Sequence, residues 1–224
     1  VTLEGTANLI LDGTKDRTVL KTDRTTEAKL NGSVTGTDAS ILTAKSTDSG
    51  KNVITGDVTL TKGSLTVSGG ELEVQGTKGV TASSIAVADG ANLLAANGGI
   101  TSTGAITGSG DLTAEKGAIA ATSALSANDI KAKTVSADSL SANSVTAETL
   151  TIATTATLGA GTSTLTGEGS VVTGLLTNDG TLTLSGTLDA QGGITTNKSL
   201  IVDAKSELTV ATSFVQKEIG RAHV

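Results

Sequence analysis

Two glutamates in the segment Glu71-Leu72-Glu73 are the side chains best placed by type and spacing for acid–base chemistry. In an extended strand, alternate side chains share a face, so both carboxylates should point outward while Leu72 points inward. Such a pair could act as general acid and base if a cleft raised the pKa of one carboxyl group. Because the chain has almost no aromatic side chains to stack on a sugar, we interpret the pair as a solvated strand face.

Basic side chains gather at two places where they could contact an anion. Lys131 and Lys133 flank Ala132, and residues 12–29 hold nine charged side chains, including Arg17 and Arg24. Arginine suits bidentate recognition of a carboxylate or phosphate group. Exposed charges are usually only solvated, however, so we interpret the two lysines as a solvated strand face. For the same reason, we interpret residues 12–29 as a charged loop or hairpin that leaves the main body.

Pairs of the form Thr-x-Thr suggest a different chemistry, because a flat and regular array of threonines is one way in which repetitive β-proteins bind ice. Five such pairs are Thr59/Thr61, Thr101/Thr103, Thr149/Thr151, Thr155/Thr157 and Thr181/Thr183. They follow one another at very unequal intervals, whereas a usable array needs one pair per structural repeat. This irregular spacing favours ordinary strand preference for threonine as their explanation.

The composition excludes several classes of function. The chain has no Cys, Trp or Tyr, its one Phe is Phe214, and its only histidine is His223, near the C-terminus. These absences exclude thiolate metal sites and Cys nucleophiles, and a formal net charge of −6 argues against nucleic-acid binding. Phosphate-binding loops and calcium-binding repeats are absent from the sequence. We therefore expect a non-enzyme with no catalytic, cofactor-binding or metal-binding residues and no cofactor.

Apolar residues recur at three different short periods along the chain. The period is seven for Val58, Leu65 and Leu72; five for Leu125, Ile130, Val135, Leu140, Val145 and Leu150; and six for Leu176, Leu182, Leu188, Ile194 and Leu200. On an α-helix a five-residue step rotates by about 140°, which would scatter the apolar residues around the axis. On a straight strand they would alternate between faces. Only a chain that turns a corner at each repeat keeps them on one side, which predicts an all-β solenoid with short strands and a thin aliphatic core.

The two ends of the sequence indicate how the chain is organised. The chain begins at Val1 and contains no Met, so we interpret it as a fragment whose start is missing. The final segment, Ile219-Gly-Arg-Ala-His-Val224, matches the translation of one frame of a common sequencing adapter. We therefore expect residues 1–218 to form a single β-solenoid fragment and residues 219–224 to be a non-native tail without function. No window is apolar enough for a transmembrane helix.

One stretch resembles the β-strand repeat of bacterial autotransporter passenger regions. It runs between Gly180 and Val202 and contains Gly-Thr-Leu-Thr-Leu-Ser-Gly, a Gly-Gly pair, Thr195-Thr196 and a second strand motif, Leu-Ile-Val. The stretch departs from the family pattern at Leu-Asp-Ala-Gln, where the family usually carries Asn-Thr-Tyr. The resemblance implies a right-handed β-helix that is exported to the surface of a Gram-negative bacterium and is often adhesive.

These observations predict a structural or adhesive rod segment of an extracellular, cell-surface protein. The resemblance implies contact with glycans or proteins of host or other extracellular surfaces, and with the outer membrane only through a β-barrel region beyond this chain. A phage tail-fibre or spike segment is the alternative; it should be a trimer, whereas a passenger segment should be a monomer. A polysaccharide-active β-helix enzyme is the most distant alternative.

Overall fold

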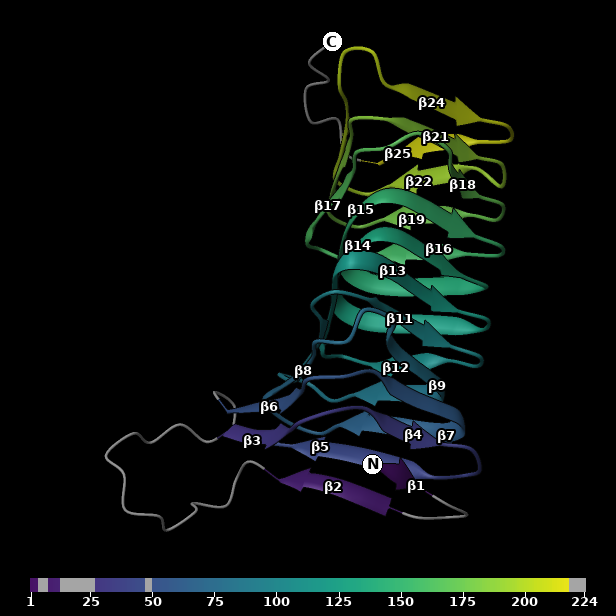
Figure 1. Cartoon of the computed structure of the whole chain (residues 1–224). Coiled ribbons are helices and arrows are strands. Elements are labelled where there is room, and N and C mark those ends of the chain that lie inside the picture. Colours follow the sequence, from purple (N-terminus) through teal and green to yellow (C-terminus); the bar gives the residue numbers. More distant parts are fainter. Residues whose placement is uncertain (4–7, 13–26, 47–49, 218–224) are drawn as a thin grey trace.

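The computed structural model describes residues 1–3, 8–12, 27–46 and 50–217. Its strands belong to one sheet, pair in parallel and wind around a common axis as a β-solenoid of about 9 turns (Figure 1). The described residues contain no helix, and so none that could cross a membrane. The all-β solenoid predicted from the sequence is confirmed, while its handedness stays a prediction.

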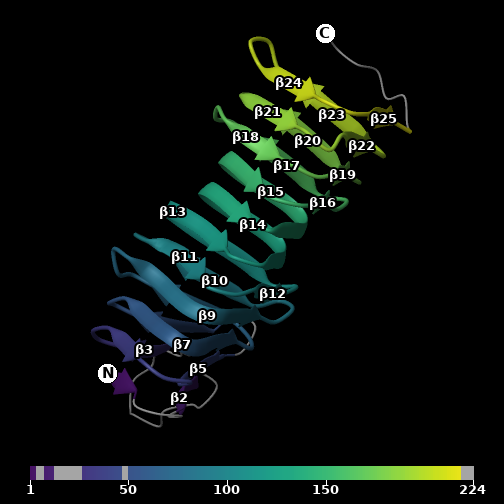
Figure 2. The same cartoon turned by 90° about the vertical axis from the view of Figure 1, so that its right-hand side faces the viewer.

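The strands lie in three rows, and each row forms one side of the rod (Figure 2). Side A consists of β1 (Thr2–Leu3), β4 (Val34–Gly36), the first parts of β7 (Val58–Val67) and β9 (Gly79–Val87), β11 (Gly99–Ser102), the last parts of β13 (Asp111–Ala121), β14 (Ala124–Ala137) and β15 (Ser139–Ile152), β18 (Ser170–Val172), β21 (Thr187–Ala190) and β24 (Glu207–Val210). Within this row, each strand between β1 and β24 pairs with the strand one coil earlier and one coil later.

Sides B and C complete each coil. Side B consists of β2 (Asn8–Asp12), β5 (Ile41–Lys45), the last parts of β7 and β9, β12 (Ile106–Gly108), the first parts of β14 and β15, β16 (Ala156–Leu158), β19 (Leu176–Asn178), β22 (Ile194–Thr196) and β25 (Phe214–Gln216). Side C consists of β3 (Glu27–Leu30), β6 (Lys51–Ile54), β8 (Glu71–Val74), β10 (Asn92–Ala95), the first part of β13, the middle parts of β14 and β15, β17 (Thr162–Leu165), β20 (Thr181–Leu184) and β23 (Ser199–Val202).

The apolar period in the sequence corresponds to one side of a coil. In the coil that begins at Val58, two steps of seven residues lead to Leu65 and Leu72, and a step of eight leads to Val80, the register partner of Val58. After three steps of the five-residue period, the coil that begins at Leu125 is complete, and Leu140 is the register partner of Leu125. We call residues 58–79 the wide coil and residues 125–139 the narrow coil.

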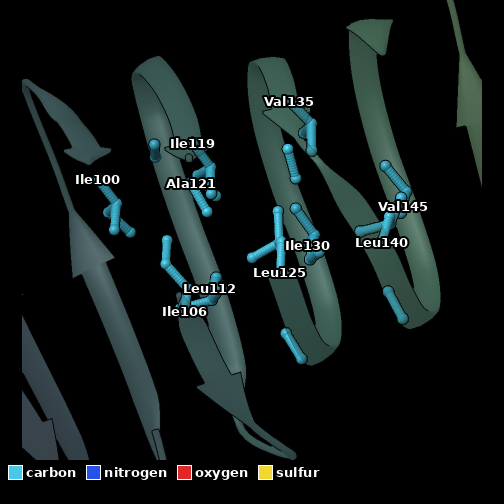
Figure 3. Packing of buried hydrophobic residues seen from close by; sticks show 14 of the residues in the cluster. Ile100, Ile106, Leu112, Ile119, Ala121, Leu125, Ile130, Val135, Leu140 and Val145 are labelled. Atoms are coloured by element: carbon cyan, nitrogen blue, oxygen red, sulfur yellow. The ribbon is translucent and has the colours of Figure 1, made fainter. Parts of the chain in front are cut away.

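The inward side chains stack in columns along the axis. Ile130 lies beside Val145 (Figure 3). Val135 lies beside Leu150, and all four residues are buried. Leu140 is only 3% exposed, whereas Ser141 next to it is exposed, as the five-residue period predicts. Each fully buried aliphatic side chain contributes about 1.5–3 kcal/mol relative to an exposed one. The stacked coils thus enclose a continuous aliphatic core that runs along the axis of the rod (Figure 3).

Glycine allows close approach of the backbone at some corners of the rod. At the corner before side A, Gly79 has a φ of +78°, and an added Cβ atom would lie 2.2 Å from the carbonyl oxygen of Gly99 in the next coil. Only glycine fits this position without strain. The narrow coil contains no glycine, and β14 continues as a strand around two of its three corners.

Most of the charged segment predicted at residues 12–29 lies outside the described residues. Asp12 is the last residue of β2 and Glu27 is the first of β3, while residues 13–26 are not described. The predicted tail at residues 219–224 also lies outside the described residues. Both interpretations therefore stay predictions.

Candidate functional site

The carboxylate pair lies on side C, on the outward face of β8. Glu71 and Glu73 are partly exposed and flank Leu72, which is completely buried, so the predicted orientation of this strand is confirmed. The parallel register places Lys51 of β6 beside Glu71 and Asn92 of β10 on its other side. We call these four polar residues (Lys51, Glu71, Glu73 and Asn92) and Gln75 the carboxylate cluster.

A lysine joins the two carboxylates of the cluster. Lys51 Nζ lies 3.0 Å from Glu71 Oε1 and forms a second ion pair with Glu73. Gln75 donates a 2.8 Å hydrogen bond from Nε2 to Glu73 Oε1, and Asn92 donates a 2.9 Å hydrogen bond from Nδ2 to Glu71 Oε2. Each carboxylate thus contacts a cation and an amide.

The pKa shifts in this cluster oppose acid–base catalysis. Partial burial raises the pKa of Glu73, but hydrogen bonds from Lys51 and Gln75, together with the positive charge of Lys51, outweigh burial and hold the pKa below its ordinary value. The hydrogen bond to Glu73 raises the pKa of Lys51, although burial lowers it. A general acid near neutral pH needs a carboxyl group with a raised pKa, so Glu73 is tuned in the opposite direction.

The carboxylate cluster also lacks the arrangement of a metal site. No group of three acidic, histidine or cysteine side chains lies close enough to hold an ion within the residues that the structure describes. The oxygen atoms of Glu71 and Glu73 instead face the ammonium group of Lys51. The arrangement joins β6, β8 and β10 across neighbouring coils, and its chemistry is that of a surface ion-pair network.

The two lysines of side C do not form a pair of anion ligands with a defined partner. Lys131 lies beside Thr113 of the preceding coil and beside Thr146 of the following one, so no opposite charge adjoins it in register. Both lysine side chains are exposed. Their position agrees with a solvated face.

The threonine pairs lie in a more regular arrangement than their sequence spacing indicates. On side A, Thr59 pairs in register with Thr81, and Thr81 pairs with Thr101. Thr59 and Thr101 are therefore two coils apart, with Thr81 on the coil between them. The uneven sequence spacing of these two pairs thus reflects in part a coil length that varies along the chain, and their explanation by strand preference stays a prediction.

Two further pairs complete this arrangement, and a search for Thr-x-Thr at a fixed interval misses both. Thr35 lies in register beside Thr59, and Thr37 stands two positions after Thr35. In the same way, Ser83 stands two positions after Thr81. A search for Thr-x-Thr and Thr-x-Ser together, with a variable interval, would find them. We call the following hydroxyl residues the threonine array: Thr35, Thr37, Thr59, Thr61, Thr81, Ser83, Thr101 and Thr103.

The remaining pairs are distributed over the other parts of the rod. Thr151 lies further along side A, Thr157 lies on side B, and Thr183 lies on side C. Side B carries its own outward column of hydroxyl groups, in which Thr157, Thr177 and Thr195 are register neighbours. Hydroxyl side chains therefore follow the strands on all three sides, and the threonine array on side A places a pair on each of four successive coils.

Comparison with protein-family models, with curated proteins and with solved structures finds no significant match for this chain. The fold class therefore rests on the strand register alone, and the function rests on the surface that the register builds.

Proposed function

We propose that this chain is a rod segment of an exported bacterial cell-surface protein, in which it serves as a rigid and adhesive spacer without catalytic activity. The observation that carries the proposal is the uninterrupted parallel ladder. From β4 to β22, the strands of every side pair with strands of both neighbouring coils. A segment with this architecture extends along one axis and places its two ends far apart (Figure 2).

Resistance to opening supports a role outside the cell. Each inner coil contributes backbone hydrogen bonds to two neighbours and buries its apolar side chains between them, so local unfolding must break several contacts at once. Short corners such as the one at Gly79 leave little extended chain for a protease. A spacer exposed to extracellular proteases needs these properties.

The distribution of exposed apolar side chains favours a monomer. The large apolar residues exposed among the described ones are Val1, Ile41, Leu175, Ile201, Val202, Phe214 and Val215. Four of them belong to strands β23 and β25 near the C-terminal end, and Ile41 and Leu175 lie many coils apart. Lateral association into a trimeric fibre needs an apolar stripe along a side, and the described residues offer none.

Outward polar side chains would supply the adhesive contacts. Amide and carboxylate groups such as those of Asn92 and Glu71 lie on side C. Groups of this kind form the hydrogen bonds by which proteins hold glycans or polar protein surfaces. Such contacts would be distributed along the rod.

Sedimentation and small-angle scattering of the purified chain test the rod, and protease treatment of intact source cells tests its location. We expect a monomeric mass, an elongated scattering profile, and release of peptides of this chain from unbroken cells. A trimeric mass would favour the tail-fibre alternative. Protection of the chain until the cells are broken would contradict surface exposure.

A further inference from the structure

The threonine array on side A forms a two-column surface. One column contains Thr35, Thr59, Thr81 and Thr101, which are successive register partners in β4, β7, β9 and β11. The second column contains the hydroxyl residue two positions later in each coil. The residue between the two is buried in every coil, so both hydroxyl residues of a pair point outward. Each of four successive coils thus presents one pair.

The second column follows the backbone ladder between β9 and β11, whereas Thr61 lies where the register between β7 and β9 shifts. The amide of Thr103 donates a 3.0 Å hydrogen bond to the carbonyl oxygen of Ala82, which places Thr103 beside Ser83. The amide of Thr122 donates a 3.2 Å hydrogen bond to the carbonyl oxygen of Ser102 in the same way. Ala120, the register partner of Thr101, then interrupts the first column and ends the array.

The array is uncharged and its hydroxyl groups face solvent. Neither column contains a charged residue. Thr59, Thr81 and Ser83 are partly exposed, and the other five members of the array are exposed. The carboxylate of Asp57, at the corner before β7, accepts hydrogen bonds from the amides of Lys78 and Gly79. The carboxylate cluster lies on side C of the same coils. Side A of these four coils therefore presents paired hydroxyl residues to water.

The spacing of this pattern is set by β geometry in both directions. Neighbouring rungs are about 4.8 Å apart, and the two residues of a pair are about 6.6 Å apart along the strand. The prism faces of hexagonal ice present oxygen atoms in a rectangular array with similar repeats. Threonine is stiff at χ1, so its hydroxyl and methyl groups keep fixed positions when the backbone is fixed. The stacked coils fix that backbone.

We propose that the threonine array is an ice-binding surface. The hydroxyl groups hydrogen-bond to water molecules in lattice positions, and the methyl groups between them order the adjacent water. Each contact is weak, but the side chains of the array act together on a surface that loses little conformational freedom on binding. The proposal does not depend on the role of the chain as a cell-surface rod.

A matched pair of double variants tests the proposal. T81K/T101K places two lysines in adjacent rungs of the array, and T157K/T177K places two lysines in adjacent rungs of side B. Purified wild-type chain and both variants are compared for thermal hysteresis and for incorporation into a slowly growing ice hemisphere. Circular dichroism establishes that all three proteins fold alike.

We expect hysteresis and incorporation for the wild type and for T157K/T177K, and the loss of both for T81K/T101K. Absence of both effects in the wild type would overturn the proposal, as would equal behaviour of the two variants. Binding of the wild type to insoluble polysaccharide but not to ice would overturn the proposal, because the array would then be a glycan-binding surface. A wild-type dimer that becomes monomeric in T81K/T101K but not in T157K/T177K would also overturn the proposal, because the array would then bind a second copy of the chain.

Discussion

The wide coil and the narrow coil solve the same packing problem with different side chains. The inward residues of the wide coil are Val58, Leu60, Leu65, Val67, Leu72 and Val74; those of the narrow coil are Leu125, Ala127, Ile130, Ala132, Val135 and Ala137. Each side of the wide coil contributes two large aliphatic side chains to the core. Each side of the narrow coil contributes one large aliphatic side chain and one alanine. The perimeter of a coil and the volume inside it therefore change together.

The corners of the two coils differ in the same sense. In the wide coil, Gly63, Gly69 and Gly76 lie at or near the corners. The narrow coil has no glycine, and β14 continues as a strand around two of its corners. Alanine has only a methyl group, so three sides can approach closely enough for the strand to curve without a specialised turn. Side-chain volume determines the coil length as much as the turn residues do.

The largest expected effect comes from a charge placed in the narrow stack, by which we mean the core of the narrow coil and of the coil that follows it, residues 140–155. Leu140→Asp puts a carboxylate among Leu125, Ala156 and the other core side chains, where no cation adjoins it in register. An unpaired buried charge costs several kcal/mol, so we expect loss of the cooperative thermal transition in circular dichroism. Ser141→Asp, at the exposed neighbouring position, is the control and should keep the transition.

A cavity in either coil should cost less than a buried charge. Leu60→Ala in the wide coil and Leu140→Ala in the narrow stack should each lower the free energy of unfolding by about 2–5 kcal/mol. Ser141→Ala should change it by no more than about 0.5 kcal/mol. Urea titration measures all three. Equal values for Leu140→Ala and Ser141→Ala would contradict the five-residue register.

Overfilling the narrow stack should have a smaller effect in the same direction. Ala142 lies beside Ala127 and Leu158 in the stack, so Ala142→Leu has no space to occupy and should cost about 1–3 kcal/mol. The same titration measures it. A stabilised variant would show that the narrow core is underpacked, and the link between coil length and core volume would then be wrong.

The smallest effect should come from the carboxylate cluster, on the surface of the wide coil. Because its ion pairs are partly exposed, Lys51→Ala should lower stability by about 0–1 kcal/mol at neutral pH. The folded state lowers the pKa of Glu73, so its contribution is present above the ordinary glutamate pKa of 4.5 and is lost as pH falls through the folded pKa.

The pH dependence of that variant identifies the ion pairs as the cause. The stability difference between wild type and Lys51→Ala should shrink in acid, where Glu73 becomes protonated. It should persist at moderately alkaline pH, because the folded state raises the pKa of Lys51 above 10.5. Thermal unfolding at several pH values measures the difference. A difference that stays constant in acid would attribute the effect to packing of the lysine stem.

The sequence predicted the fold where the apolar period was short and constant. Leu125, Ile130 and Val135 are the three sides of one coil, and their burial confirms the bend that a five-residue period requires. The outward direction of Glu71 and Glu73 followed from strand alternation alone. Both results depend only on local geometry, which a single segment of sequence contains.

The register between coils could not be predicted in the same way. It depends on the length of each corner, which differs from coil to coil. The coil that begins at Val58 leads to Val80, the one at Leu125 leads to Leu140, and the one at Leu176 leads to Ile194. For this reason Thr59 and Thr101 stand at an irregular distance in the sequence, and nothing in it connects Lys51 with Glu71. Contacts between coils require the register of the whole stack.

Two spin-label pairs test most directly whether the chain completes a three-sided coil between Leu125 and Leu140. The chain has no cysteine, so labels at S126C/S141C and at S126C/S136C can be introduced without interference. Ser126 and Ser141 are register partners on side B, about 4.8 Å apart in the backbone, whereas Ser136 lies on side A. We predict strong dipolar broadening for S126C/S141C and much weaker broadening for S126C/S136C, although the second pair is closer in sequence. Equal broadening, or stronger broadening in the second pair, would contradict the solenoid.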